Sequence, residues 1–401
     1  MTTRKMPSLI GGILLVIGNV IGAGILALPI AIAQLGWPVA MLTLVVFWLL
    51  MMVGAFYFLE ANLALPKGSN LISMSKAALG KPGVIVAWGC YLLVMYSLIA
   101  AYLSGGGDLV KINFQYLGIT LPSWSSSILF LLIFGFIVTR GIHVTDHTNR
   151  VLMLSKAVIF FTAVLGIASH FDPHTLFLIP QKSVSASLLV VTITSFGFAT
   201  LIPSLRSYYQ DDVVRLKKII FWGTLIPLLC YMLWSTVIFS VVPYEGSYGL
   251  SHMAHSTHPV SDLQAALSQA LHRPWITQAT NIFSAICIIT SFLANSISLT
   301  DFIHDGIQPS DKHRKSWIVY TLAWLPALLA VLFYQKAFLM GLSIAGTLAI
   351  VQLLVLPMVI VWRFRDARKN KSVPYTVPGG KMLLAFLIFI SVMFFFLTFI
   401  L

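Results

Sequence analysis

Continuously apolar stretches alternate along this chain with short segments that carry most of its charged residues. Most of these stretches exceed about 18 positions, the length that a helix needs to cross a lipid bilayer, and they lack the strict alternation of a half-buried strand. Eleven stretches fit this description, although the fourth is short: 8–35, 38–64, 84–107, 126–139, 149–170, 187–208, 219–242, 275–299, 317–333, 337–362 and 382–401. The pattern predicts an all-α polytopic membrane protein with one transmembrane domain over residues 1–401.

Two of the predicted spans contain interruptions that an ordinary membrane helix does not need. The first span holds GNVIGAGI at 18–25, followed by Pro29, and the sixth holds TSFGFAT at 194–200, followed by Pro203. Inside a helix, glycine costs about 1 kcal/mol and proline about 3 kcal/mol relative to alanine, whereas proline is well tolerated in the first turn of a restarted helix. Close packing of helices through small residues is the alternative explanation. The recurrence of the pattern in two spans favours two broken helices.

The two interrupted spans each begin a set of five spans, and an odd number of crossings gives the second set the opposite orientation. We therefore expect two inverted repeats, over about residues 8–170 and 187–362, followed by an eleventh helix at about 382–401. Interrupted segments at corresponding positions of two inverted halves indicate the central site of a transporter.

The ends of broken helices offer two complementary kinds of group to a ligand. Free N–H groups at Gly22, Ala23 and Gly24, at the positive end of a helix dipole, suit a carboxylate. Carbonyl groups near Asn19 and Ser195 suit an ammonium group. An amino acid carries both charged groups on one carbon, so the sequence predicts an amino acid transporter.

Composition excludes a soluble protein, because 58% of the 401 residues are hydrophobic and only 9% are charged, against roughly 25% charged residues in an ordinary soluble domain. The formal charge of +13 follows the predicted topology, with 20 Lys and Arg residues on one side of the membrane and four on the other. By the positive-inside rule we expect a cytoplasmic N-terminus and, after eleven crossings, a C-terminus outside. The positive charge is therefore explained by the orientation of the chain in the lipid bilayer and not by binding to nucleic acid.

Neither the cysteines nor the histidines form a recognisable metal site. Three cysteines lie far apart in apolar runs and are interpreted as small apolar residues, namely Cys90, Cys230 and Cys287. Three histidines recur at steps of three in one loop, with no carboxylate nearer in sequence than Asp262, at positions His252, His255 and His258. A solvated loop is favoured over a zinc site, and we expect no metal and no cofactor.

Six stretches carry a resemblance to a known family: GNVIGAGILALP at 18–29, FLEAN around Glu60, LIAAYLSGGGDL at 98–109, NRVLMLSKAVIF at 149–160, TSFGF at 194–198 and TSFLANSISLTDF at 290–302. In order and over nearly the whole chain, they resemble the hydroxy and aromatic amino acid permeases of the amino acid/polyamine/organocation superfamily, above all the bacterial tyrosine-specific permeases. The resemblance implies a leucine-transporter-like fold of ten core helices plus an eleventh. It also implies secondary active symport of substrate and protons into the cell, driven by the proton motive force across the bacterial cytoplasmic (inner) membrane, and we expect a functional monomer.

Lys156 is a basic residue inside a predicted span, about seven residues from the start of the fifth. Its ammonium group either extends to the membrane interface or belongs to an ion pathway. The resemblance favours the ion pathway, because it implies that a lysine on the fifth helix replaces a sodium ion between helices one and eight. Glu60, near the end of the second span, pairs with a loop lysine, braces the first helix or transfers protons. The candidates for ion coupling are Lys156, Val20, Ser291, Asn295 and Glu60.

Aromatic residues beside the interruptions are candidates for contact with the substrate side chain. Phe196 and Phe198 flank Gly197 in the sixth span. Tyr96 and Tyr102 in the third span either gate the site or anchor their helix at the interface. We predict an aromatic amino acid, tyrosine first, as the substrate, with tryptophan or a wider range of neutral amino acids as the alternative. A polytopic membrane enzyme, the rival class, needs convergent His, Asp, Glu or Cys residues at one membrane face. The sequence lacks such a cluster, so no catalytic residues are assigned and the protein is not expected to be an enzyme.

Overall fold

The structure of this chain, a computed structural model, describes residues 8–140, 142–177, 186–307, 317–334, 336–367 and 374–400. Throughout those ranges the regular elements are helical and no strand occurs. In the same part of the chain, seven helices are long and apolar enough to cross a membrane, and a bent pair of helices raises the number to eight. The predicted all-α polytopic membrane protein is therefore confirmed.

The helices follow the stretches predicted from the sequence. The first stretch forms the bent pair, α1 (Leu9–Val20) and α2 (Gly24–Ile32) with η1 (Ala33–Leu35). The long helices are α3 (Trp37–Leu63), α4 (Leu71–Tyr116), α6 (Ile142–Ala168), α10 (Val213–Val241), α13 (Pro274–Ile307), the unit α15 (Ala337–Ala349), η3 (Ile350–Val355) and α16 (Leu356–Ala367), and α17 (Gly380–Ile400). The remaining stretches form shorter helices: α5 (Ser123–Thr139), α14 (Trp317–Phe333), and the pair α8 (Ala186–Ser195) and α9 (Ile202–Tyr208). Every predicted stretch is thus helical, while the count of eleven crossings stays a prediction.

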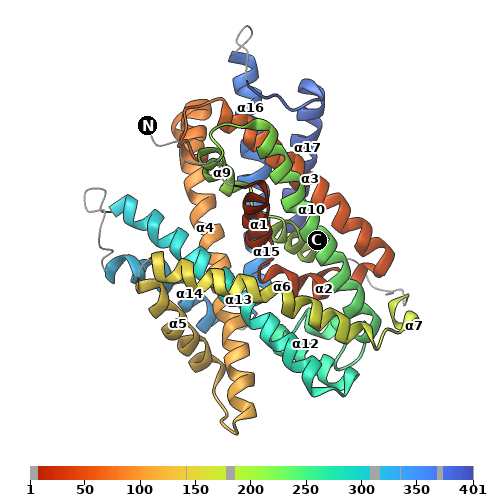
Figure 1. Cartoon of the computed structure of the whole chain (residues 1–401). Coiled ribbons are helices and arrows are strands. Elements are labelled where there is room, and N and C mark those ends of the chain that lie inside the picture. The colour runs from red at the N-terminus through yellow and green to blue at the C-terminus, as the bar shows by residue number, and fades with distance from the viewer. Residues whose placement is uncertain are drawn as a thin grey trace.

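The long helix α4 runs between the two ends of the molecule (Figure 1). Its first turns are set at an angle to the rest, because Gly80 has a φ of 67°, a left-handed conformation that glycine adopts without steric cost. Figure 1 places α9 near the beginning of α4 and α12 (Pro259–Leu271) toward its other end. Two further short helices, α7 (Pro173–Leu176) and α11 (Leu250–Met253), lie in the connections before α8 and α12.

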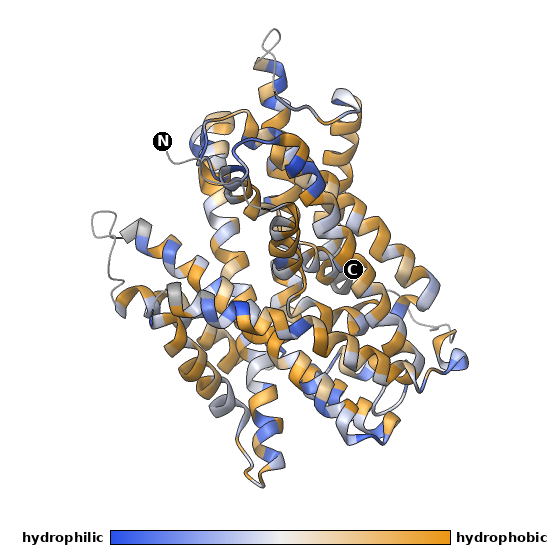
Figure 2. Cartoon of the chain, in the orientation of Figure 1, coloured by the Kyte–Doolittle hydropathy of each residue, from blue (hydrophilic) through white to orange (hydrophobic). Residues whose placement is uncertain are grey.

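Apolar side chains cover much of the outer surface. On α17 the rings of Phe386, Phe389 and Phe396 are all more than half exposed. Figure 2 shows hydrophobic residues along the long helices, with hydrophilic ones gathered at the ends of α4 and α16 and on α12. Exposed apolar surface of this extent is unfavourable in water, so it is the surface expected to face lipid.

Small residues bring α15 close to two neighbouring helices, α4 and α8. A Cβ atom on Gly341 would lie 2.6 Å from the carbonyl oxygen of Ser97 on α4, and one on Gly346 would collide with the carbonyl oxygen of Val190 on α8. Backbones that approach this closely need glycine at the contact. The packing fixes α8, and with it one of the predicted breaks, against the centre of the bundle.

Part of the basis for the predicted orientation lies outside the described residues. The basic residues concerned are Arg4, Lys5, Lys182, Lys312, Arg314, Lys315, Arg368, Lys369 and Lys371. The cytoplasmic N-terminus, the external C-terminus and the inverted repeats therefore stay predictions.

Candidate functional site

The first predicted break lies between α1 and α2, whose axes differ in direction by 56°. α1 ends at Val20 and α2 begins at Gly24. In the gap, the N–H of Gly22 donates to the Val20 carbonyl over 2.8 Å, and the N–H of Ala23 donates to Ser291 Oγ on α13 over 3.1 Å. The break expected from the glycine run is present. However, the Val20 carbonyl and Ser291 already accept from two of the three N–H groups predicted to hold a carboxylate, those of Gly22 and Ala23.

The second break follows α8, which ends at Ser195, and three residues without regular structure separate it from η2 (Ala199–Leu201). The N–H of Gly197 donates to the Thr194 carbonyl over 3.1 Å, which closes a turn instead of continuing the helix. Gly24 packs on Ser195, since a Cβ atom on Gly24 would lie 3.3 Å from the Ser195 Cα and collide with Ser195 Oγ. The break and the close-packing interpretation both hold, and the two breaks lie side by side.

Lys156 reaches from α6 into the first break. Its Nζ donates to the Ile21 carbonyl over 2.7 Å and to Thr290 Oγ1 on α13 over 2.9 Å. The residue is only 5% exposed, which is incompatible with an ammonium group extended to the membrane interface. The acceptor at the end of the first helix is Ile21, the residue after the candidate Val20. Lys156 therefore links the break of α1 to α13, and both of its acceptors are neutral.

Tyr231 on α10 joins the two breaks. Its Oη lies 2.6 Å from the Val20 carbonyl oxygen and 2.9 Å from the Ser195 carbonyl oxygen, at the last residues of α1 and α8. The side chain is fully buried, and the Phe196 ring packs edge-on against it with 5.3 Å between centroids. Sequence reasoning missed this residue. A tyrosine in the middle of an apolar span was the available signal, because a buried phenol hydroxyl needs a partner.

The two candidate tyrosines of α4, Tyr96 and Tyr102, have different surroundings. The Tyr96 hydroxyl donates to the Leu322 carbonyl on α14 over 2.9 Å, so it holds α4 against α14. Tyr102 is only 6% exposed and lies beside Ser291, the residue that accepts from the Ala23 N–H. The two tyrosines lie six residues apart on one helix, and the apolar pattern of the sequence does not distinguish the sides that they face.

Other predicted site residues differ in their surroundings. Phe196 and Phe198 are buried beside the second break. Asn19 is exposed on α1, while Asn295 donates through Nδ2 to the Ser291 carbonyl of its own helix over 2.9 Å. The geometry thus gathers Val20, Ala23, Gly24, Lys156, Ser195 and Ser291 around the breaks and adds Ile21, Tyr102, Tyr231 and Thr290.

Glu60, at the end of α3, is held by an arginine and not by a loop lysine. Arg365 Nε donates to Glu60 Oε1 and Arg365 Nη2 to Glu60 Oε2, each over 2.7 Å. The N–H of Val377 donates to Glu60 Oε2 over 2.8 Å. A bidentate pair with an added backbone donor is among the stronger polar contacts in proteins. This arrangement favours a role in bracing α3 against α16 over proton transfer.

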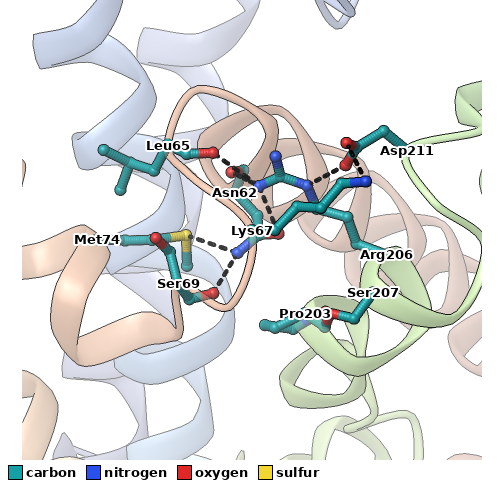
Figure 3. Close-up of polar contacts among 9 residues, drawn as sticks. All are labelled: Asn62, Leu65, Lys67, Ser69, Met74, Pro203, Arg206, Ser207 and Asp211. Carbon is teal, nitrogen blue, oxygen red and sulfur yellow. Dashed lines mark hydrogen bonds and ion pairs between the residues drawn. The ribbon is translucent and has the colours of Figure 1, made fainter.

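A second polar cluster lies at the end of α9 (Figure 3). Arg206 Nη1 donates to the carbonyl oxygens of Asn62 and Leu65, and Arg206 Nε lies 2.6 Å from Asp211 Oδ1. Lys67 Nζ lies 3.1 Å from the other oxygen of Asp211. Burial disfavours the Asp211 carboxylate, but the hydrogen bonds from Arg206 and Lys67 outweigh it and hold the pKa of Asp211 below its usual value. The cluster ties the loop after α3 to the second half of the interrupted α8–α9 pair.

One of the three loop histidines has a carboxylate partner. His258 Nδ1 lies 2.7 Å from Asp108 Oδ1 on α4, and this hydrogen bond raises the pKa of His258 while partial burial opposes the rise. Sequence reasoning did not anticipate this partner, because Asp108 lies 150 positions away, whereas His252 and His255 are exposed, as expected for a solvated loop. Among the residues that the structure describes, no three metal-binding side chains gather into a candidate site.

Comparisons with known proteins agree with this geometry. A family model described as the tryptophan/tyrosine permease family matches residues 5–398. Over 390 residues the chain is 30% identical to tyrosine-specific transport system 1 of Haemophilus influenzae. The aligned region covers 97% of this chain and 96% of that protein. Over 399 residues it is 27% identical to a tryptophan-specific transport protein of Shigella flexneri (98% and 94%). Over 384 residues it is 24% identical to glutamine transporter 2 of Aliivibrio fischeri (94% and 95%).

The matches extend over nearly all of the chain, including both breaks and the lysine between them. These relatives are named for the transport of amino acids, and none of the three names describes an enzyme. The chain therefore belongs to the tryptophan/tyrosine permease family, as a multi-pass membrane protein that transports amino acids and is not an enzyme.

Proposed function

We propose that the protein imports an aromatic amino acid, tyrosine first, by proton-coupled symport. The observation that carries the proposal is the buried Lys156 ammonium group between the Ile21 carbonyl and Thr290. A charged group inside a membrane protein is costly and commonly marks an ion pathway. Gain and loss of one proton at Lys156 changes the charge beside the broken helix without a metal ion, and this change couples the proton gradient to the movement of substrate.

The proposed architecture is the leucine-transporter-like one, with inverted repeats at about residues 8–170 and 187–362 and an eleventh helix. Each predicted repeat begins with an interrupted helix pair, α1–α2 or α8–α9, which supports the assignment. We place the protein in the bacterial inner membrane as a monomer, with the N-terminus in the cytoplasm and the C-terminus outside. Rocking of spans one, two, six and seven against three, four, eight and nine gives alternating access.

The two breaks supply the proposed substrate contacts. The N–H group of Gly24, at the start of α2, is assigned to the substrate carboxylate, with the N–H groups of Gly22 and Ala23 shared with the Val20 carbonyl and Ser291 Oγ. Carbonyl groups at the ends of α1 and α8 are assigned to the ammonium group, because the negative end of each helix dipole lies there. Phe196 and Phe198 line the side-chain region. An aromatic substrate suits these buried rings, which favour ring-to-ring contact.

Reconstituted vesicles test the proposal directly. Purified protein in proteoliposomes is expected to accumulate radiolabelled tyrosine when the pH gradient is imposed, and to need no sodium. Unlabelled tyrosine, tryptophan, phenylalanine, glutamine and alanine are then compared as competitors. Uptake that is independent of the pH gradient, or that requires sodium, contradicts proton coupling, whereas stronger competition by another amino acid corrects only the substrate.

Tryptophan is the second candidate substrate, followed by a wider range of neutral amino acids. The similarity to the tryptophan-specific protein of Shigella flexneri and to glutamine transporter 2 of Aliivibrio fischeri spans more than nine-tenths of the chain in each case. The same competition series decides among these substrates.

Glu60→Gln separates bracing from proton transfer. Because the substitution removes the charge that Arg365 pairs with in a largely buried position, it is expected to lower the melting temperature in detergent by several degrees. Proton-driven uptake per folded molecule is expected to persist. Lys381→Gln, which removes an exposed ion pair with Asp366, is the control and is expected to change the melting temperature little. Loss of pH-gradient dependence in Glu60→Gln would assign Glu60 to the proton pathway.

A further inference from the structure

Tyr231 is the group through which α10 touches both broken helices. Its hydroxyl lies within hydrogen-bond distance of two backbone carbonyls, those of Val20 and Ser195, at the ends of α1 and α8. The two carbonyls belong to residues 175 positions apart in the chain, and the Tyr231 hydroxyl is the polar atom that spans them. The spacing of these carbonyl oxygens is therefore set by one side chain from a third helix.

Tyr231 Oη and the two carbonyl oxygens, of Val20 and Ser195, can accept more hydrogen bonds than the neighbouring groups donate to them. A phenol hydroxyl carries one hydrogen, so Tyr231 donates to one of the two carbonyls at a time, and the other oxygen faces Oη without a proton between them. The Val20 carbonyl also accepts from the Gly22 N–H, whereas the hydroxyl of Ser195 is turned to the Val191 carbonyl of its own helix over 2.9 Å. A cluster with more acceptors than hydrogens suits a cationic donor with several N–H groups.

The carbonyl of Ile21, next to Val20, accepts a hydrogen bond from a cationic donor. Ile21, one residue after Val20, gives its oxygen to the Lys156 ammonium group. The chain thus presents successive carbonyls of the first break to two different partners, one cationic and one a neutral hydroxyl.

We propose that Tyr231 is a positioning residue for the substrate ammonium group: it holds the Val20 and Ser195 carbonyls at the separation at which, together with Oη, they receive three N–H donors. The inference rests on the proposed amino acid transport. It assigns the selectivity for a primary ammonium group to a side chain on α10 as well as to the two broken helices.

Tyr231→Phe keeps the ring against Phe196 and removes the hydroxyl. In proteoliposomes the KM for tyrosine is expected to rise on the order of ten-fold or more, with a smaller change in kcat. Competition by 3-(4-hydroxyphenyl)propanoate, which has hydrogen in place of the ammonium group, is expected to stay unchanged. Tyr57→Phe is the matched control, because Tyr57 is also fully buried and its hydroxyl has no hydrogen-bond partner among the described residues. Equal weakening of both ligands in Tyr231→Phe would show a merely structural role and overturn the proposal.

A measurement on the unaltered chain keeps the proposal testable if Tyr231→Phe does not fold. Tyrosine carrying one, two or three N-methyl groups has progressively fewer N–H donors, and its inhibition constant is expected to rise at each step. Equal inhibition by tyrosine and its N-trimethyl derivative would overturn the three-acceptor site. The two conclusions remain distinguishable, because an unaltered protein that transports no amino acid refutes the proposed function. A transporting protein that ignores N-methylation refutes only the inference.

Discussion

Replacement of Lys156 by glutamine is expected to abolish accumulation of tyrosine against its gradient when a pH gradient is imposed. The substitution removes a buried ammonium group and its two hydrogen bonds, to the Ile21 carbonyl and Thr290 Oγ1. Hydrogen bonds from charged donors contribute about 1.5–3 kcal/mol each, so the junction between the first break and α13 weakens at the same time as the titratable charge is lost. Accumulation ratios in proteoliposomes are expected to fall to about one.

Exchange experiments separate coupling from general loss of activity. Counterflow of labelled against unlabelled tyrosine needs no net proton movement, so Lys156→Gln is expected to retain measurable counterflow that no longer responds to the pH gradient. Lys76→Gln, at an exposed position of α4, removes a charge of the same kind and is expected to behave like the unaltered protein. Undiminished proton-driven accumulation in Lys156→Gln would refute the assigned role of the lysine.

Gly24→Ala is expected to reduce the uptake rate by an order of magnitude or more, although it adds a single methyl group. The new Cβ would lie 3.1 Å from Ser195 Cβ and 3.3 Å from Ser195 Cα, and would collide with Ser195 Oγ. Overpacking of this kind costs about 1–3 kcal/mol, and here it pushes apart the two broken helices that are proposed to bind substrate. Radiolabelled uptake, corrected for the amount of protein in the membrane, measures the effect.

A compensating substitution identifies the cause. In the double variant Gly24→Ala and Ser195→Gly, loss of the Ser195 hydroxymethyl group makes room for the new methyl group, so most of the lost rate is expected to return. Such a double-mutant cycle reports the coupling between the two positions. Gly89→Ala is the control, since a Cβ at Gly89 meets no atom within 4 Å. A double variant no better than Gly24→Ala alone would mean that the loss does not arise from this contact.

The features that are predicted correctly from the sequence depend on residues that are neighbours in the chain. Apolar length predicts the helices, and the run of glycines predicts the break between Val20 and Gly24, because both depend on neighbouring residues. The lysine was found for a similar reason: a charge inside an apolar stretch stands out. Ile21, its acceptor on the first helix, lies at the predicted break, next to the last residue of α1. The position of a break is therefore easier to predict than the hydrogen bonds that form there.

Contacts between distant segments account for most of what was missed. Tyr231 touches Val20 and Ser195 across gaps of 211 and 36 positions, and its sequence surroundings resemble those of any tyrosine in a membrane helix. The sequence does not distinguish Tyr96 from Tyr102, because both lie in one apolar helix and only the packing of α14 and α13 separates their surroundings. Glu60 pairs with Arg365 and His258 pairs with Asp108, and in both cases the partner is distant in sequence.

Arg206, at the end of α9, affects which amino-acid substitutions the loop after α3 can accept. Arg206 donates hydrogen bonds chiefly to main-chain oxygens: that of Asn62 at the end of α3 and that of Leu65 in the loop after it. Most substitutions preserve a carbonyl oxygen, so the loop can change its side chains while its path stays tied to α9. An alanine scan of the loop would therefore register little at Leu65, whereas loss of the single guanidinium would remove both main-chain contacts at once. In a family alignment, this contact would show as one retained arginine facing a variable partner, without covariation between them.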